Sequence, residues 1–334
     1  SEPRAQPRLY TIPPSAPFLT TLARAILAGD LPTPGGMKPD RLSLPHTTIY
    51  LPTRRAARTL REAFLEESGG EALLLPRILA LGHADEDEAL ILNAERFDDT
   101  DTNLGKPAIE PTARLIALMR MILAWSRGAG VAGPVGLQGR LPMTPAQAAG
   151  LAADLASLMD AADSEEADLS ALDTLVPKEL AAHWAETVAF LTILTEQWPN
   201  FLHEVGLVSP VGRRNALIAQ ETKRLAAGSP HPVIAAGSTG TVPATARLLQ
   251  TIALLSNGAV VLPGLDLTLD AESWETLGRH PEHPQASMAE LLKKLDATRD
   301  DVMPVPGSAP DGPELARLRL VSETLRPAET TERW

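Results

Sequence analysis

The sequence of 334 residues contains no cysteine. It therefore has no disulfide, no thiolate nucleophile and no site in which cysteines hold zinc or an iron–sulfur cluster. Aromatic residues make up only 4% of the chain. No apolar run reaches the length of about 18 residues that spans a bilayer, and the amino-terminal Ser-Glu-Pro-Arg lacks the pattern of a signal peptide. We expect a globular cytoplasmic protein without a membrane segment.

Acidic and basic residues are unevenly distributed along the chain. The formal net charge is −12, which argues against nucleic-acid binding over the whole surface, because an acidic surface repels phosphate. Residues 85–110 hold nine acidic and two basic residues, whereas residues 41–61 hold five arginines and no acid. A basic track inside an acidic shell is therefore compatible with the composition.

Short apolar runs that read as strands lie at residues 8–12, 48–51, 232–236 and 259–262. The first three are each followed by a turn and by apolar residues at helical spacing. Repeated strand–turn–helix units predict a parallel α/β sheet with right-handed crossovers.

The middle of the chain has a different pattern. From Pro111 to about residue 227 the apolar residues recur at helical spacing, with a Gly/Pro-rich link between two of the stripes. We expect an α/β domain made of residues 1–110 and 228–334, interrupted by an all-helical insertion of residues 111–227.

Residues 47–65 combine a strand, a loop and a helix. Thr53 is placed to cap the helix with its hydroxyl, and Arg54, Arg55 and Arg58 follow it. The loop should lie at the carboxyl edge of the sheet, where open α/β folds bind ligands. Free N–H groups of a helix start and guanidinium groups both suit phosphate. The stretch indicates a contact to a nucleic-acid backbone.

The same arginines have a second interpretation. The helix also carries nearby acids, Glu62 and Glu66, with which the arginines could pair; Glu62 is four residues after Arg58. The arginines would then belong to a solvated helix face. The residues alone leave both interpretations open.

A second loop of small donors, Gly237-Ser238-Thr239-Gly240-Thr241, also follows a strand and precedes a helix. Ser238 and Thr239 could contact phosphate at the same sheet edge. The alternative is a turn that needs glycine for positive φ. The loop lacks the Asp–Glu pair with which a helicase holds Mg²⁺.

The loop after the first strand stands where a nucleotide-binding fold has its glycine-rich loop. A phosphate loop needs glycines, whose N–H groups wrap the phosphates, and a lysine that reaches the outer ones. Residues 13–19 contain neither glycine nor lysine. We therefore predict that Pro14, Ser15, Ala16 and Pro17 form a degenerate nucleotide loop that does not bind ATP.

Two pairs of metal-ligating residue types occur near the carboxyl-terminal end. Asp266 and Asp270 are four residues apart, and His280 and His283 are three apart. Neither pair has an evident third ligand, so the sequence predicts no metal site.

Seven blocks of the sequence resemble the AddB family in its alphaproteobacterial form, the second subunit of the AddAB helicase–nuclease. They follow one another in the order of that family. The blocks are residues 10–18, 49–57, 75–78 with 81–82, 236–249, 258–266, 283–285 and 325–332.

The resemblance implies a RecA-like fold of the superfamily-1 helicase type with a helical insertion. It implies a role in resecting double-strand DNA ends for recombinational repair, with a DNA end as ligand and an AddA-type motor and nuclease subunit as heterodimer partner. The nuclease domain of the family, with its iron–sulfur cluster and Mg²⁺, would lie beyond residue 334. No cofactor is expected within this segment.

Some AddB proteins keep a phosphate-binding loop, and residues 13–19 depart from that pattern. The ATPase motor would therefore belong to the partner subunit. We expect an ATPase-inactive, helicase-like domain that guides or reads single-stranded DNA. Two alternatives stay open: a nucleotide hydrolase with an atypical loop, and a purely structural module that docks the motor subunit.

Overall fold

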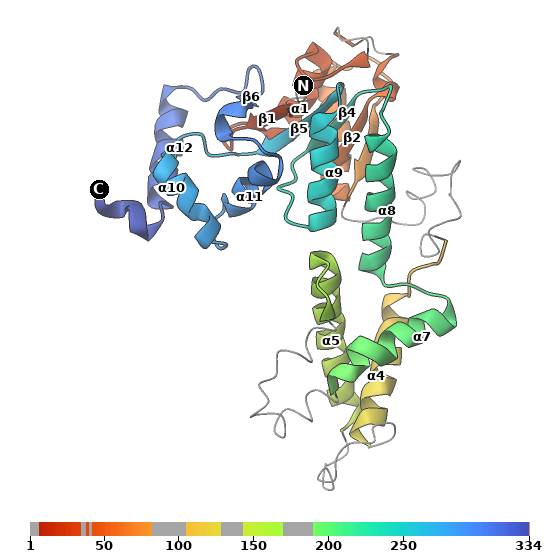
Figure 1. The fold of residues 1–334 in the computed structure, drawn as a ribbon. Coiled ribbons are helices and arrows are strands. Elements are labelled where there is room, and N and C mark those ends of the chain that lie inside the picture. The colour runs from red at the N-terminus through yellow and green to blue at the C-terminus, as the bar shows by residue number, and fades with distance from the viewer. Residues whose placement is uncertain are drawn as a thin grey trace, which may run out of the picture. The chain divides into compact units, whose positions relative to one another are not determined.

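The computed structural model forms two compact units, one of residues 1–92 and 218–334 and one of residues 93–217. Helix α8 (Pro210–Ala226) contributes residues to both. The sequence placed the return to the α/β unit after this helix, at residue 228. The structure describes residues 7–34, 38–39, 42–81, 105–127, 143–169 and 190–333 (Figure 1).

A parallel sheet organises the first unit. In the part of the chain that the structure describes, the sheet has six strands in the order β3-β2-β4-β5-β1-β6, and all neighbours pair in parallel. Helices flank it, which confirms the predicted RecA-like α/β fold. The strands are β1 (Leu9–Ile12), β2 (Thr48–Leu51), β3 (Arg77–Ala80), β4 (Val233–Ala236), β5 (Gly258–Pro263) and β6 (Val302–Pro304).

Both faces of the sheet are buried, because successive side chains of a strand point to opposite faces. Ile49 and Leu51 of β2 pack in one cluster with α1 (Phe18–Ala28) and α2 (Arg54–Glu67). Tyr50 packs in a second cluster with α9 (Pro243–Leu254), α11 (Ala286–Lys294) and the end of α8. Burial on both faces explains why the strands are almost continuously apolar.

The remaining elements of this unit follow β5. The side chain of Asp270 caps α10, accepting from the N–H of Ser273 at 2.8 Å. Asp311 and Glu314 form a capping box at the start of α12. The elements are α10 (Ala271–Thr276), η6 (Leu277–Arg279), η7 (Arg299–Asp301), α12 (Gly312–Thr324) and η8 (Ala328–Arg333), while η2 (Leu44–His46) precedes β2.

The second unit is helical. Its apolar core is built from α4, α5, the π-turn η5 and α7, and it includes Trp198. Arg114 is only 5% exposed and is held by Asp160 at 2.7 Å and by the carbonyl of Ala156 at 3.0 Å. The elements are α4 (Pro111–Ser126), α5 (Pro145–Glu165), η5 (Ile193–Gln197) and α7 (Trp198–Val205).

A buried polar group ties β2 to α8 within the first unit. The hydroxyl of Tyr50 donates a short hydrogen bond to Glu221, whose carboxylate also pairs with Arg224 at 2.6 Å. Tyr50 is 2% and Glu221 4% exposed. Burial, followed by the neighbouring carboxylate, raises the pKa of Tyr50, so the phenol stays protonated and remains a donor.

We expect Tyr50→Phe to lower the free energy of unfolding by about 1–3 kcal/mol, because a buried carboxylate loses a donor. Tyr10→Phe is the matched control, since the hydroxyl of the half-buried Tyr10 has no hydrogen bond among the described residues. Urea denaturation of both variants measures the difference. Equal stability of the two would show that the Tyr50 hydroxyl contributes nothing net.

Candidate nucleic-acid interface

The loops that follow β1, β2, β4 and β5 meet at the carboxyl edge of the sheet. Gly237, after β4, donates its N–H to the carbonyl of Val261 in β5 at 3.0 Å. Gly264, after β5, donates to the carbonyl of Ile12 in β1 at 2.8 Å. These cross-strand bonds extend the ladders past the strand ends and fix the loops side by side.

Positive φ favours glycine at two positions of this edge, where the loops also lie close together. Gly237 has φ +75°, and a Cβ there would lie 3.3 Å from Phe18 Cε1 and 3.6 Å from Pro52 Cδ. Gly264 has φ +65°, and a Cβ would lie 3.4 Å from Pro14 Cδ. Positive φ is strained for other residues. The loop after β4 therefore touches both the loop after β2 and the start of α1.

Thr53 caps α2 as predicted. It has extended backbone angles, and its Oγ1 accepts from the N–H of Ala56 at 3.1 Å. The cap satisfies one of the free amides of the helix start. The hydroxyl of Thr53 therefore has a structural partner, while the residue itself stays exposed at the sheet edge.

The arginines of α2 are exposed. Arg54, Arg55 and Arg58 all face solvent, and the first turn of α2 holds no acidic residue. Within the described ranges, neither Arg55 nor Arg58 forms an ion pair. Arg55 and Arg58 therefore do not form the ion pairs with Glu62 or Glu66 that the alternative interpretation assumes. Cations at a helix N-terminus oppose the helix macrodipole.

Ser238 and Thr239 lie half-buried in the loop after β4. The Oγ of Ser238 accepts from the N–H of Gly240 at 3.4 Å, which closes a local turn. The positive φ of Gly237 supports the interpretation of this loop as a glycine-dependent turn. Its contact with Pro52 still places the loop beside the start of α2.

The loop after β1 offers few donors. Pro13, Pro14 and Pro17 have no backbone N–H. The N–H of Ala16 is already bound to the carbonyl of Pro13 at 3.1 Å, so Ser15 supplies the one other backbone N–H among residues 13–17. A phosphate cradle built from successive amides is therefore absent from residues 13–17.

Asp266 and Asp270 have separate structural roles. One oxygen of Asp266 accepts from Thr268 and Leu269 in the turn after β5. Asp270 caps α10 and pairs with Arg326. The backbone bond from Ser273, together with Arg326, lowers the pKa of Asp270 to about 2. Among the described residues no three His, Asp or Glu side chains converge as a metal site would need.

His280 and His283 are likewise engaged with other groups. His280 lies between Glu329 at 2.8 Å and Glu282 at 3.1 Å. His283 accepts from the N–H of Gln285 at Nδ1, so Nε2 carries the hydrogen and donates to the carbonyl of Leu325. Both histidines thereby hold the end of α12 and η8 to the elements after β5.

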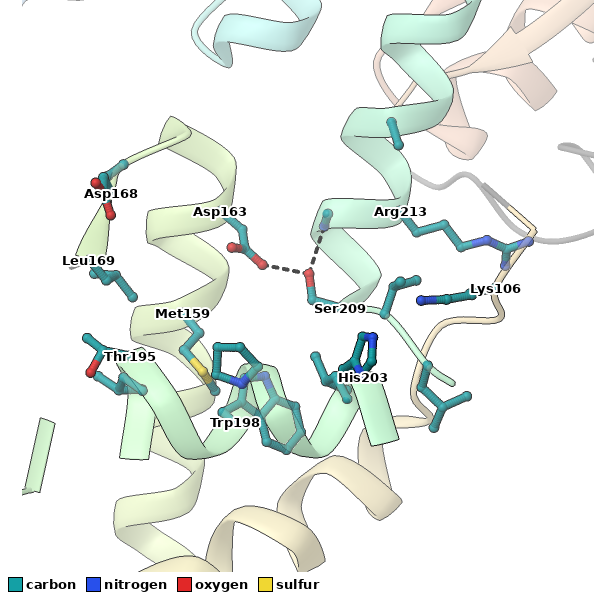
Figure 2. A pocket seen from close by; sticks show the side chains of 18 residues that line it. Lys106, Met159, Asp163, Asp168, Leu169, Thr195, Trp198, His203, Ser209 and Arg213 are labelled. Carbon is teal, nitrogen blue, oxygen red and sulfur yellow. Dashed lines mark hydrogen bonds between the residues drawn. The ribbon is translucent and has the colours of Figure 1, made fainter. Parts of the chain in front are cut away.

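The second unit contains a cavity of about 670 Å³. Figure 2 shows Asp163 joined to Ser209, whose hydroxyl donates at 2.6 Å and accepts from the N–H of Gly212 at 2.9 Å. Lys106, His203 and Arg213 also line it, as does Asp168. Groups of both signs face this space, so its charge favours neither an anion nor a cation.

No model of a known protein family matches the chain, and no curated protein matches it either. The resemblance to AddB therefore stays a prediction. No helix within the described ranges is both long and apolar enough to cross a bilayer.

Sequence reasoning missed the polar groups that position this edge. Tyr50 and Glu221 are 171 residues apart, and Arg326 and Asp270 are 56 apart. No local spacing indicates either pair. The one signal available was a tyrosine inside an otherwise aliphatic strand, because a buried phenol usually finds a polar partner.

We expect Thr53→Ala to destabilise the first unit by about 1 kcal/mol, through loss of the cap on Ala56. The matched control is Thr59→Ala, the same change at an exposed position inside α2, where alanine is the better helix former. Chemical denaturation gives both values. Thr53→Ala being as stable as Thr59→Ala would contradict the cap.

The hydrogen bonds that His280 donates to Glu329 and Glu282 raise the pKa of His280 above its ordinary value. A raised pKa means that the charged ring stabilises the folded state below the unfolded pKa of about 6.5, and that this contribution is lost as the pH rises through the folded pKa. We expect an NMR titration to give a pKa above 6.5 for His280 and a lower one in Glu329→Gln. An unchanged pKa in that variant would exclude the pair.

Proposed function

We propose that the first unit is an ATPase-inactive, helicase-like module that holds single-stranded DNA by its phosphate backbone. The observation that carries this proposal is the start of α2. Three exposed arginines stand there without an acidic neighbour in the first turn, at the edge where four loops meet.

The charge arrangement supports an anionic ligand. Each cation near a helix N-terminus costs about 0.3–1 kcal/mol, because it faces the positive end of the macrodipole. A phosphate at this place would reverse the sign of that interaction and would also accept from guanidinium groups. Arg54, Arg55 and Arg58 therefore suit a bound polyanion better than an empty surface. Ser238 and Thr239 would border the same path.

The loop after β1 supports the interpretation of this unit as a scaffold without ATPase activity. A motor needs a cradle of amides and a lysine for the outer phosphates. Residues 13–17 contain three prolines and no lysine. Energy for movement along DNA would then come from a partner subunit, as the resemblance to AddB implies. In that setting the module would act in the cytoplasm during end resection for recombinational repair.

The DNA proposal is tested with Arg55→Ala/Arg58→Ala, because these substitutions remove charge without breaking an ion pair. Each lost phosphate contact lowers the slope of log K against log salt by about 0.7 for a single strand. Two contacts predict a decrease of about 1.4, or up to about 25-fold weaker binding in 0.1 M salt, at every sequence. Fluorescence anisotropy with labelled single strands over a salt series measures it.

The control is Arg317→Ala/Arg319→Ala, which removes the same charge from exposed positions of α12. It should leave the slope nearly unchanged. Equal effects of the two double variants would mean that only net charge matters. Unchanged binding in both, with DNA bound by the wild type, would refute the assignment to α2.

We expect no saturable ATP binding below about 1 mM, since the first loop lacks the donors for a triphosphate. Isothermal titration of the chain with Mg–ATP measures this directly. Saturation at micromolar concentration would favour the nucleotide hydrolase. A chain that binds neither ATP nor DNA, yet is retained by a motor subunit in a pull-down, would favour the docking module.

A further inference from the structure

A second, smaller cavity lies in the first unit, at the carboxyl ends of β1 and β5. Its volume is about 230 Å³. Pro13, Pro14 and Pro304 form part of the wall, and Leu315 and Leu318 of α12 face it from the other side. The proline-rich turn after β1 therefore borders an apolar space.

The charge of this cavity excludes a polyphosphate. Of the described residues that line it, none is lysine or arginine, and Asp266 is the only acid. A carboxylate in an apolar wall repels an anion and attracts a cation, and the attraction grows as water is excluded.

Most polar groups of the wall are already satisfied within the fold. Thr11 Oγ1 donates to the carbonyl of Leu262 and accepts from the N–H of Leu265. The amide of Gln285 donates to the carbonyl of Gly264 and accepts from the N–H of Asp266. Neither group is available to a ligand.

The two further polar groups of the wall are Ser322 and Asp266. Ser322 is 5% exposed, and its hydroxyl acts on the Asp266 carboxylate, whose pKa it lowers. The three internal hydrogen bonds of Asp266 all go to Oδ1, from Thr268 and Leu269.

Asp266 is ionised in this setting. Burial acts to raise its pKa, but the nearby Ser322 hydroxyl and the bonds from Thr268 and Leu269 outweigh burial, so the pKa lies below its usual value. The wall thus combines one carboxylate and one buried hydroxyl with prolines and leucines.

We propose that this cavity binds a small organic cation, with an apolar body inside the wall and an amine that reaches Asp266 and Ser322. A dry cavity of about 150 Å³ holds benzene. A volume of about 230 Å³ therefore suits a body of about the size of a bicyclic aromatic ring. The amine donates to the carboxylate and the Ser322 hydroxyl, and no covalent step is involved.

This site is independent of the proposed DNA contact. No arginine of α2 lines the cavity. Loss of DNA binding in Arg55→Ala/Arg58→Ala leaves the cation site intact, and failure of the cation site leaves the DNA proposal untouched.

The test compares three probes with the same indole body by titration of the full chain in two-dimensional NMR. Tryptamine is a cation, 3-ethylindole is neutral and indole-3-propionate is an anion. We expect tryptamine to bind best and at least tenfold more tightly than the anion, with shifts in α12 and in the turn after β5. No saturable binding of tryptamine up to a few millimolar, or equal affinity for all three probes, would overturn the proposal.

Two variants and a control separate charge from shape. Asp266→Asn keeps an oxygen for the turn but should remove the preference for tryptamine over 3-ethylindole. Ser322→Leu should fill the cavity and abolish binding of all three probes. Leu320→Ala changes an exposed residue of α12, 66% exposed and outside the wall, and should leave every affinity unchanged. A preference that survives Asp266→Asn, or binding that survives a folded Ser322→Leu, would refute the site.

Discussion

The parallel pairing of β1 with β5 and β6 is the constraint on which the first unit depends. It brings Leu9 beside Val260 and Val302, so segments more than 240 residues apart share one sheet. Loop closure over such a length is entropically costly and is offset by burial on both faces of the sheet. Once the strands are aligned, their carboxyl ends coincide. The alignment of the strands is therefore enough to make neighbours of the loops that could contact a ligand.

The sequence predicted the elements whose pattern is local. The apolar runs of β1, β2, β4 and β5, and the cap at Thr53, follow from residue types a few positions apart, and the structure confirms them. Strand β6 was missed because Val302–Pro304 is three residues long and borders a stretch rich in proline and glycine. A strand this short has too few residues to show periodicity.

Contacts between distant residues could not be predicted. Glu221 of α8 stabilises β2, and Arg326, between α12 and η8, stabilises the region after β5. The sequence around neither residue indicates its distant partner. The cavity under α12 is likewise formed only when β1, β5 and α12 come together. Residue types at the sheet edge were visible in the sequence, whereas their shared surroundings depend on the fold.

Three prolines in the five residues after β1 have one more consequence. Each fixes its own φ near −65° and restricts the residue before it, so the segment has little conformational freedom to lose or regain. The phosphate-binding loops of motor proteins change shape as the nucleotide is bound and released. In residues 13–17 the three proline rings leave little freedom for such a change of shape.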